Sequence, residues 1–313
     1  MSYTIINLNY NCMQYDKIKK RPVQFQSLTS LSVQNFNFLL PYFKAEWDEY
    51  NYYFTLKGKL RERLSYTRVD TIVPKIADKL MFLLIFLKTN PLQEHHAASF
   101  GITQPQANNL IHLLSGLLKK ALKRLGELPE RNAYKTKYIV ALFQDVLLDG
   151  VERPIQRPQA SDLQKSCYSE KKTHNVKNNV LTTLGRRILW LSKTFDGSVH
   201  DKKICDNQPL YLPIGITLWQ DTGFQGYNPE GVNVKMPTKK PKGKELSEDQ
   251  KEINRSISSV RVKVEHAIGG AKICRIVKDR FRCHKFGFDD LVMELACGLH
   301  NLRMTLIGNA IPI

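Results

Sequence analysis

Three acidic residues occur in contexts that could support metal-dependent chemistry on phosphates. Asp149 follows the apolar run VLL, Asp221 follows the apolar segment GITLWQ, and Glu265 lies in a segment with helical periodicity. We expect both aspartates to lie just past the ends of buried strands, where the backbone is fixed and the side chain reaches the rim of a sheet. Carboxylates are hard ligands that suit Mg²⁺, and two ions roughly 3.5–4 Å apart can promote phosphoryl transfer. The three residues therefore predict a site for two Mg²⁺ ions, in which Mn²⁺ is expected to substitute.

The segment that carries Glu265, SVRVKVEHAIGGAK, could be either an alternating strand or a helix. Ser247 and Gln250 have the spacing of a capping box, which marks the start of a helix. From there apolar residues recur every three or four positions, so the segment is predicted to be a helix with one buried face. That face comprises Ile253, Ile257, Val260, Val264, Ile268 and Ala271.

A second line of residues borders the apolar face of this helix and consists of Asn254, Arg261, Glu265 and Lys272. A charged stripe usually faces solvent and forms ion pairs between residues four positions apart. Because this stripe borders the buried face, it could instead place Glu265 against the sheet that carries Asp149 and Asp221. Arg261 and Lys272 would then hold DNA phosphates, since DNA approaching three carboxylates needs local positive charge.

The elements predicted around the aspartates are strands of one sheet. KYIVALFQDVLLDG contains a buried strand, and THNVKNNVLTTLGRRILWLSK reads as two strands joined at Leu184-Gly185, with Val180, Ile188 and Trp190 inside. Asp201, in GSVHDKKI, is expected to cap the following helix, with a supporting role near the metals as the alternative. Residues 228–246 are rich in Pro, Gly and Lys and predict an exposed basic loop.

The first part of the chain is predicted to be helical. Thr29 is expected to begin one helix, and Thr71 a second helix that contains the apolar run LMFLLIFL, which is too short to span a bilayer. A short helix around residues 92–100, a turn at Gly101 and a helix opened by Thr103 then match the helix-turn-helix pattern, although a plain helical hairpin gives a similar one. In that motif the second helix enters the major groove with its N-terminal residues. Amide side chains suited to base edges stand there, namely Gln104, Gln106, Asn108 and Asn109.

The charge of the chain points to a polyanionic partner. Of the 313 residues, 47 are Lys or Arg and 29 are Asp or Glu, which gives a net charge of +18. Both halves are basic, with +10 in residues 1–138 and +8 in the remainder. Nucleic acid is the most common polyanion, although the charge could also serve solubility alone. Six scattered cysteines without a C-x-x-C pair argue against a zinc ribbon or a disulfide framework.

Two groups of cations are predicted to contact DNA phosphates. The first lies on the predicted hairpin, where a solvated hairpin is the alternative reading, and consists of Lys171, Lys172, Lys177, Arg186 and Arg187. The second lies in the basic loop, where it would touch phosphates without reading sequence, and consists of Lys239, Lys240, Lys242 and Lys244.

Taken together, the motifs resemble the bacterial insertion-sequence transposases of the DDE superfamily, in particular the large insertion-sequence family numbered five. The stretches that carry the resemblance are LLDGVERPIQRP, YSEKKTHNVKNNVL, DGSVHDKKI, LWQDTGFQGY and NRSISSVRVKVEHAIGGAK, within about residues 28–305. The signature of that family around its glutamate is Tyr, two residues, Arg, three residues, Glu, six residues and Lys. Arg261, Glu265 and Lys272 keep this spacing, whereas Ser258 stands at the tyrosine position.

The resemblance implies an α/β fold, namely an RNase H-like mixed sheet with flanking helices, preceded by an all-α helix-turn-helix region. The expected organisation is a weakly ordered N-terminus over 1–27, a DNA-binding domain over 28–133 and a catalytic domain over 134–313. The resemblance also implies that Asp149, Asp221 and Glu265 are the catalytic, metal-binding residues. The expected partner is double-stranded DNA, both element ends and target, bound by a homodimer in the bacterial cytoplasm and associated with the nucleoid, with no membrane or small-molecule partner.

The implied reaction is cleavage at the ends of the element by water, followed by attack of the freed 3′-OH on a target phosphodiester. Such a reaction depends on positioning and charge stabilisation and needs no protein nucleophile. Two alternatives remain at this point. A DNA-binding regulator with a non-catalytic sheet would not depend on the three carboxylates, and a nuclease of the same fold would cut DNA without strand transfer.

Overall fold

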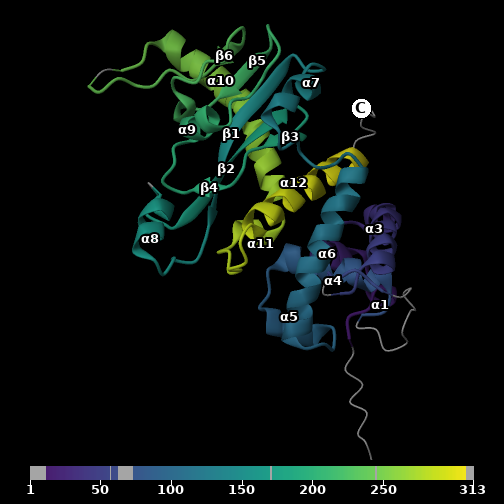
Figure 1. Cartoon of the computed structure of the whole chain (residues 1–313). Helices are drawn as coiled ribbons and strands as arrows, with labels where there is room; N and C mark the ends of the chain where they lie inside the picture. The colour runs from purple at the N-terminus through teal and green to yellow at the C-terminus, as the bar shows by residue number, and fades with distance from the viewer. Residues whose placement is uncertain (1–11, 57, 63–72, 170, 244, 308–313) are drawn as a thin grey trace, which may run out of the picture. The chain divides into compact units, whose positions relative to one another are not determined.

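The computed structural model describes residues 12–56, 58–62, 73–169, 171–243 and 245–307, which form two compact units, 1–121 and 122–313 (Figure 1). The division falls earlier than the expected boundary after residue 133. The reason is that Arg187 of the sheet donates to Glu127 and to the carbonyl of Gly126, while Arg131 donates to Asp290. These bonds make the segment after residue 121 part of the second unit.

Helices make up the first unit. They are α1 (Tyr15–Ile18), α2 (Pro22–Thr29), α3 (Val33–Tyr53), α4 (Ile76–Thr89), α5 (Gln93–Ser99) and α6 (Gln104–Arg124), the last of which ends in the second unit. Within the described part of the segment expected to be weakly ordered, α1 and α2 are folded. Tyr15 stacks on Phe36 with ring centroids 4.8 Å apart, and Phe25 meets Phe36 edge-on. Aromatic packing therefore orders this segment.

Helix starts differ from the predictions at two places. Thr29 ends α2, where its hydroxyl donates to the Phe25 carbonyl, and Ser32 caps α3 by accepting from the Asn35 amide. Thr71 lies outside the described residues, and α4 begins at Ile76. The run Leu80–Leu87 is buried inside this unit. Over the described residues, the protein has no helix with the length and apolar character that crossing a membrane requires.

The predicted helix-turn-helix is present. Helix α5 leads to Gly101, whose φ of 66° reverses the chain, and α6 follows with its apolar side buried. His96 anchors the pair because its ring lies 4.2 Å from Phe82 between centroids and its Nε2 is 3.1 Å from the Phe82 carbonyl oxygen. Burial lowers the pKa of His96 to about 4, so the imidazole is neutral in the folded unit.

The second unit is a sheet flanked by helices. Its elements are η1 (Ala133–Lys135), α7 (Thr136–Val140), β1 (Asp145–Pro154), α8 (Ser161–Cys167), β2 (Asn175–Thr183), β3 (Ile188–Leu191), β4 (Phe195–Asp196), α9 (Asp201–Asn207), β5 (Thr217–Gln220), η2 (Thr222–Phe224), β6 (Asn233–Lys235), α10 (Glu248–Ala271), α11 (Arg275–Lys278) and α12 (Phe288–Ile307).

The sheet has six strands in the order β3-β2-β1-β5-β6, with β4 also paired to β2. Strands β1, β2 and β3 form antiparallel neighbours, whereas β5 runs parallel to β1 and β6 runs parallel to β5. The β2–β3 hairpin turns at Leu184-Gly185, and Val180, Ile188 and Trp190 are buried, as predicted. This is the mixed, RNase H-like arrangement expected from the sequence.

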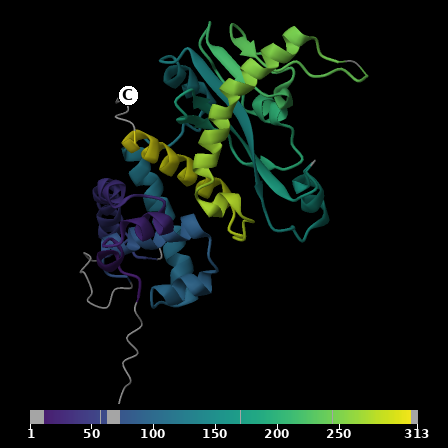
Figure 2. The same cartoon turned by 180° about the vertical axis from the view of Figure 1, so that it is seen from behind.

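The two faces of the sheet are covered by different helices. Val146 and Leu148 of β1 pack with Cys205 of α9 and Val140 of α7 on one face. Because side chains alternate along a strand, Asp149 and Arg153 point to the opposite face, over which α10, α11 and α12 lie. Figure 2 shows α10 crossing this face. Apolar side chains are buried on both faces, since Val264 and Ala271 of α10 and Leu295 of α12 are also buried, and Asp149 lies on the α10 face.

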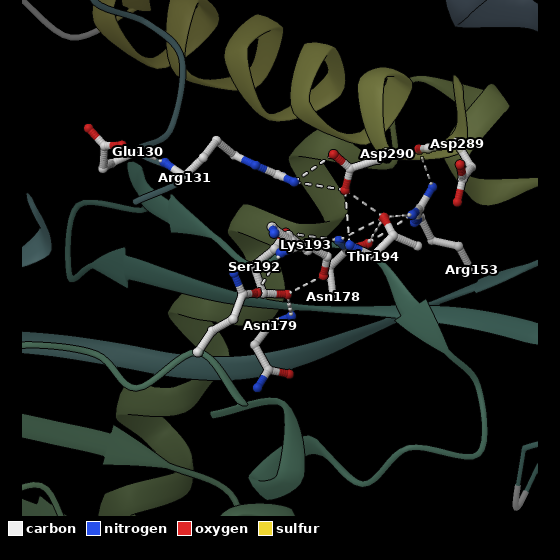
Figure 3. A network of polar contacts seen from close by, with 11 residues as sticks. Glu130, Arg131, Arg153, Asn178, Asn179, Ser192, Lys193, Thr194, Asp289 and Asp290 are labelled. Atoms are coloured by element: carbon white, nitrogen blue, oxygen red, sulfur yellow. Dashed lines mark hydrogen bonds and ion pairs between the residues drawn. The ribbon is translucent and has the colours of Figure 1, made fainter. Parts of the chain in front are cut away.

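A buried polar network joins the sheet to the start of α12 (Figure 3). Arg131 donates to both carboxylate oxygens of Asp290, at 2.7 and 2.6 Å, and Thr194 donates to Asp290 through its hydroxyl at 2.7 Å and its amide at 3.0 Å. Arg153 donates to the Asn178 side chain and to the carbonyl of Asp289, both at 2.8 Å. Burial alone would raise the pKa of Asp290, but Arg131 and the Thr194 hydrogen bonds together lower it.

We expect Asp290→Asn to destabilise the second unit by about 2 kcal/mol at pH 7, because it leaves Arg131 without its carboxylate in a partly buried site. The folded pKa of Asp290 is lowered, so its contribution is present above the unfolded pKa and is lost as the pH falls through the folded value. Urea unfolding followed by tryptophan emission measures both effects, since two of the three tryptophans, Trp190 and Trp219, lie in the second unit. The control is Asp206→Asn, which breaks a more exposed Lys202 pair and should cost less than about 0.5 kcal/mol. Equal effects of the two variants would contradict the prediction.

Candidate catalytic site

The pairing of β1 with β5 brings the two predicted aspartates together. The parallel register ends at Leu148 of β1 opposite Gln220 of β5, so Asp149 and Asp221 are the residues that directly follow this last pair. Asp221 directly follows β5, as predicted. Asp149 was expected past a strand end but lies inside β1, which continues to Pro154 because β2 pairs with it over that whole length.

Each aspartate is fixed by one oxygen and presents the other to the same cation. Oδ1 of Asp149 accepts the Gly150 amide at 2.8 Å, and Oδ1 of Asp221 accepts the amide and hydroxyl of Thr222. Oδ2 of Asp221 lies 3.2 Å from Nη2 of Arg261, and Oδ2 of Asp149 lies 3.9 Å from the same nitrogen. The two carboxylates therefore converge on one guanidinium.

Arg261 is positioned by α10, which forms as predicted. The capping box between Ser247 and Gln250 is complete, and the helix runs from Glu248 to Ala271 with Ile257, Val264 and Ala271 buried. Ile253, expected on the buried face, is 55% exposed because the first turns of α10 extend beyond the core. The Arg261 side chain is only 13% exposed, and its buried Nε has no hydrogen-bond partner among the described residues.

The environment of Asp149 favours its protonated form. Burial raises its pKa to about 6, against the attraction of Arg261 and the Gly150 amide, and the nearby charges of Asp221 and Asp201 raise it further. A carboxyl group whose pKa is raised in this way is typical of functional sites and less common in purely structural positions.

Glu265 is exposed and lies one turn after Arg261, on the same side of α10. Lys272 is the C-cap of this helix, and burial together with the charge of Lys171 lowers its pKa. Over the residues that the structure describes, no three His, Cys, Asp or Glu side chains converge closely enough to hold a metal ion. Helix α10 thus lies over the face of the sheet to which Asp149 points, and its Arg261 lies beside the carboxylates of Asp149 and Asp221.

Sequence reasoning missed the placement of Asp201. His200 occupies the N-cap position of α9, and Asp201 does not cap the helix through its side chain. Its carboxylate instead packs against β1 and η2, since a Cβ built on Gly150 would lie 2.7 Å from it and one on Gly223 3.3 Å from it. The signal was a glycine close behind each aspartate, in DG and DTG, which leaves the room that Asp201 fills.

The hairpin cations do not form one exposed row. Lys171, Lys172 and Arg186 are exposed, whereas the Lys177 side chain is 11% exposed and lies between Glu152 at 3.5 Å and Asp201 at 3.6 Å. Arg187 donates to Glu127 at 2.8 Å and to Thr305 at 2.9 Å. Lys177 and Arg187 are therefore engaged in contacts within the unit, and contact of the hairpin cations with DNA stays a prediction.

The amide residues at the start of α6 are only partly available. Gln104 donates to Gln93 of α5 at 2.6 Å, Gln93 donates to Asn108 at 3.2 Å, and Gln106 accepts the Thr103 amide at 2.9 Å. Asn109 is exposed. These contacts stabilise the helix-turn-helix, so reading of base edges by Gln104, Gln106 and Asn108 would require them to exchange partners.

The basic loop over 228–246 is largely exposed where it is described and extends away from the sheet before α10 (Figure 1). Its start forms β6, which the composition did not predict. Two hydrogen bonds tie Thr238 to Asn254 of α10, at 2.8 and 3.0 Å. Lys239, Lys240 and Lys242 follow this anchor in exposed positions, with Lys240 paired to Glu245, and Lys244 lies outside the described residues.

Comparison with known proteins agrees with this geometry. A protein of Microchaete diplosiphon, named the probable transposase for insertion sequence element IS702, is 25% identical over 301 residues, which cover 94% of this chain and 99% of that protein. A candidate transposase for insertion sequence element IS112 of Streptomyces albus G is 23% identical over 74% of this chain and 81% of its own length. No solved structure matches the chain.

Two family models match separate parts of the chain. Residues 148–301, which begin one residue before Asp149 and include Asp221 and Glu265, match the DDE superfamily endonuclease. Residues 75–124, which comprise α4, α5 and α6, match the helix-turn-helix of DDE superfamily endonucleases. Over these ranges the chain is thus similar to the endonuclease domain and the helix-turn-helix of the DDE superfamily, and it is a distant relative of insertion-sequence transposases.

Proposed function

We propose that this protein is the transposase of an insertion sequence, of the family numbered five, which binds the terminal inverted repeats of its element and cuts and joins DNA. The observation that carries the proposal is the β1–β5 register, which places Asp149 and Asp221 side by side facing α10, the helix of Glu265. The similarity to the two insertion-sequence relatives supports it. Joining two ends to one target calls for a homodimer on DNA, which sedimentation of the protein–DNA complex measures.

The donor atoms fit a divalent metal, as the DDE superfamily implies. The carboxylates of Asp149 and Asp221 offer hard oxygens, and a cationic group already occupies the space between them, in the form of the Arg261 guanidinium. Asp149, Asp221 and Glu265 would hold the metal, for which two Mg²⁺ are proposed. Bound there, the metal would supply positive charge at the scissile phosphate and increase the acidity of the attacking hydroxyl or water.

Arg261 then has two roles in succession. Without metal, its guanidinium offsets the repulsion between the two aspartates and keeps them close together. With metal and DNA present, the same side chain would turn to a phosphate, for which the planar guanidinium is well suited. The two oxygens bonded to Gly150 and Thr222 keep the aspartates oriented in both situations.

We predict that Glu265→Gln reduces cutting and joining by at least about 100-fold, because it keeps the shape of the side chain but removes its charge. The assay is excision in Mg²⁺ from a plasmid that carries the gene's own flanking DNA. Glu252→Gln, on another side of the same helix, is the control and should be unaffected. If both variants bind DNA as the wild type does and wild type cuts nothing, the protein is a regulator; cutting without joined products makes it a nuclease.

Metal binding should depend on pH through Asp149. Its folded pKa is about 6, and a protonated carboxyl does not bind a cation, so affinity should be constant above pH 7. Below pH 6 it should fall about tenfold per pH unit, as one proton must leave for each metal bound. Titration of the DNA-free protein with Mn²⁺ between pH 5 and 8 measures this. Asp149→Asn should bind more weakly with a flatter profile, and equal wild-type affinities at pH 5.5 and 7.5 would exclude Asp149 from the site.

We expect Arg261→Gln to bind Mn²⁺ more tightly, on the order of tenfold, because the competing guanidinium is gone. The same variant should cut DNA more slowly, since a phosphate partner is lost. The readout is a Mn²⁺ titration of the DNA-free protein beside the excision assay. Arg255→Gln, an exposed change on the same helix, serves as the control. Weaker metal binding by Arg261→Gln would mean that Arg261 assembles the metal site instead of competing for it.

A further inference from the structure

A groove of about 1380 Å³ opens at the end of β1 in the second unit. One wall is the segment 155–160 between β1 and α8 together with Leu163 of α8, and the other is the loop 280–287 between α11 and α12. The walls are joined by backbone bonds, since Phe281 donates to the Pro154 carbonyl at 2.9 Å and Gln156 donates to the Phe281 carbonyl at 3.2 Å. We name this feature the β1-end groove.

Positive charge lines the β1-end groove. Its cationic residues are Arg131, Arg157, Lys193, Arg280 and Lys285, and its acidic residues are Asp196, Asp289 and Asp290. Arg131 and Asp290 neutralise each other at 2.6 Å. The remaining cations are exposed, and Arg157 is steadied at the rim by hydrogen bonds to Gln164 at 2.9 and 2.7 Å. Apart from the Arg131–Asp290 pair, the residues that line the groove therefore carry more positive than negative charge.

Apolar side chains also face the β1-end groove. Ile155, Val176, Phe195 and Phe281 line it together with Leu163, which is 53% exposed. Phe286 at the loop tip is 102% exposed, so its ring has the solvent contact of an isolated residue. Exposing an aromatic ring to water costs free energy, because its apolar area is not buried. An exposed aromatic side chain among cations is typical of surfaces on which nucleic-acid bases stack.

The combination of charge and apolar surface discriminates between ligands. The volume exceeds the roughly 300–1,000 Å³ of pockets for small molecules, which favours a polymer. Duplex DNA presents phosphates outward and keeps its bases stacked, so it would use the cations but not the apolar lining. A single strand offers both, with phosphates for the rim and base faces for the apolar residues.

We propose that the β1-end groove binds an unpaired strand of DNA and that Phe286 stacks on one of its bases. The proposal rests on the proposed function, because it names where the strand next to the cleavage point is held. Asp149 and Ile155 are separated by six steps along the extended chain, which span roughly 20 Å at about 3.3 Å per step. An unpaired strand that leaves the carboxylates would have to cover about this distance, a few nucleotides, to reach the groove.

The test is binding of a fluorescent single-stranded oligonucleotide to the full chain in EDTA, where no cutting occurs. Phe286→Ala should weaken binding about tenfold, the loss of one stacked base. It should also abolish the quenching of a 2-aminopurine placed in the oligonucleotide. The charge variant Lys285→Ala should weaken binding less but reduce its salt dependence, because one phosphate contact is lost. Duplex DNA of the same length should bind Phe286→Ala as well as it binds wild type.

Two control variants match the substitutions. Ile214→Ala removes an 88% exposed apolar side chain elsewhere in the same unit, and Lys203→Ala removes an exposed cation outside the groove. Equal behaviour of Phe286→Ala and Ile214→Ala would overturn the proposal, as would tighter binding of an RNA strand of the same sequence. This test is independent of catalysis. If the protein never cuts DNA but binds a single strand through Phe286, the groove proposal stands and the proposed transposase function fails.

Discussion

The parallel register between β1 and β5 is the constraint on which the candidate site depends. The register ends with the pair Leu148 and Gln220, and the residue that follows each member of this pair is an aspartate. Beyond this point β1 is paired with β2 only, while the segment after β5 forms the short helix η2. A shift of one residue in either strand would move one aspartate to the opposite face of the sheet, because side chains alternate. The chemistry of the site is thus set by backbone hydrogen bonding before any metal arrives.

Two neighbouring carboxylates need compensation, and the fold supplies it from different sides. Arg261 of α10 meets both aspartates from one face, and the Gly150 and Thr222 amides each bind one of their oxygens. On the α9 face Asp201 adds further negative charge near the same backbone, and Lys177 lies 3.6 Å from it. Negative charge is therefore concentrated where β1 and β5 diverge, which suits the binding of cations and requires cations nearby when none is bound.

Sequence periodicity predicted most elements, but not the contacts that decide residue roles. The capping box of α10, the β2–β3 hairpin and the helix-turn-helix could be predicted because their signals are local. Asp149 was expected beyond its strand because VLL ends there, yet pairing with a distant strand carries β1 on to Pro154. The surroundings of Lys177 and Asp201 could not be predicted for the same reason, since their burial depends on neighbours that the local pattern does not reveal.

The excess length of β1 has its own consequence for function. Had the strand ended at Asp149, the carboxylates would stand at a terminus with nothing to guide DNA beyond them. Instead the strand continues to Pro154, whose carbonyl accepts the Phe281 amide. Phe281 belongs to the loop 280–287, which forms one wall of the β1-end groove. Arg153, midway, is used internally through Asn178 and Asp289 and is not free to hold phosphates. In the proposed function, the same strand separates the site of cutting from the groove that holds the unpaired strand, and it fixes the distance between them.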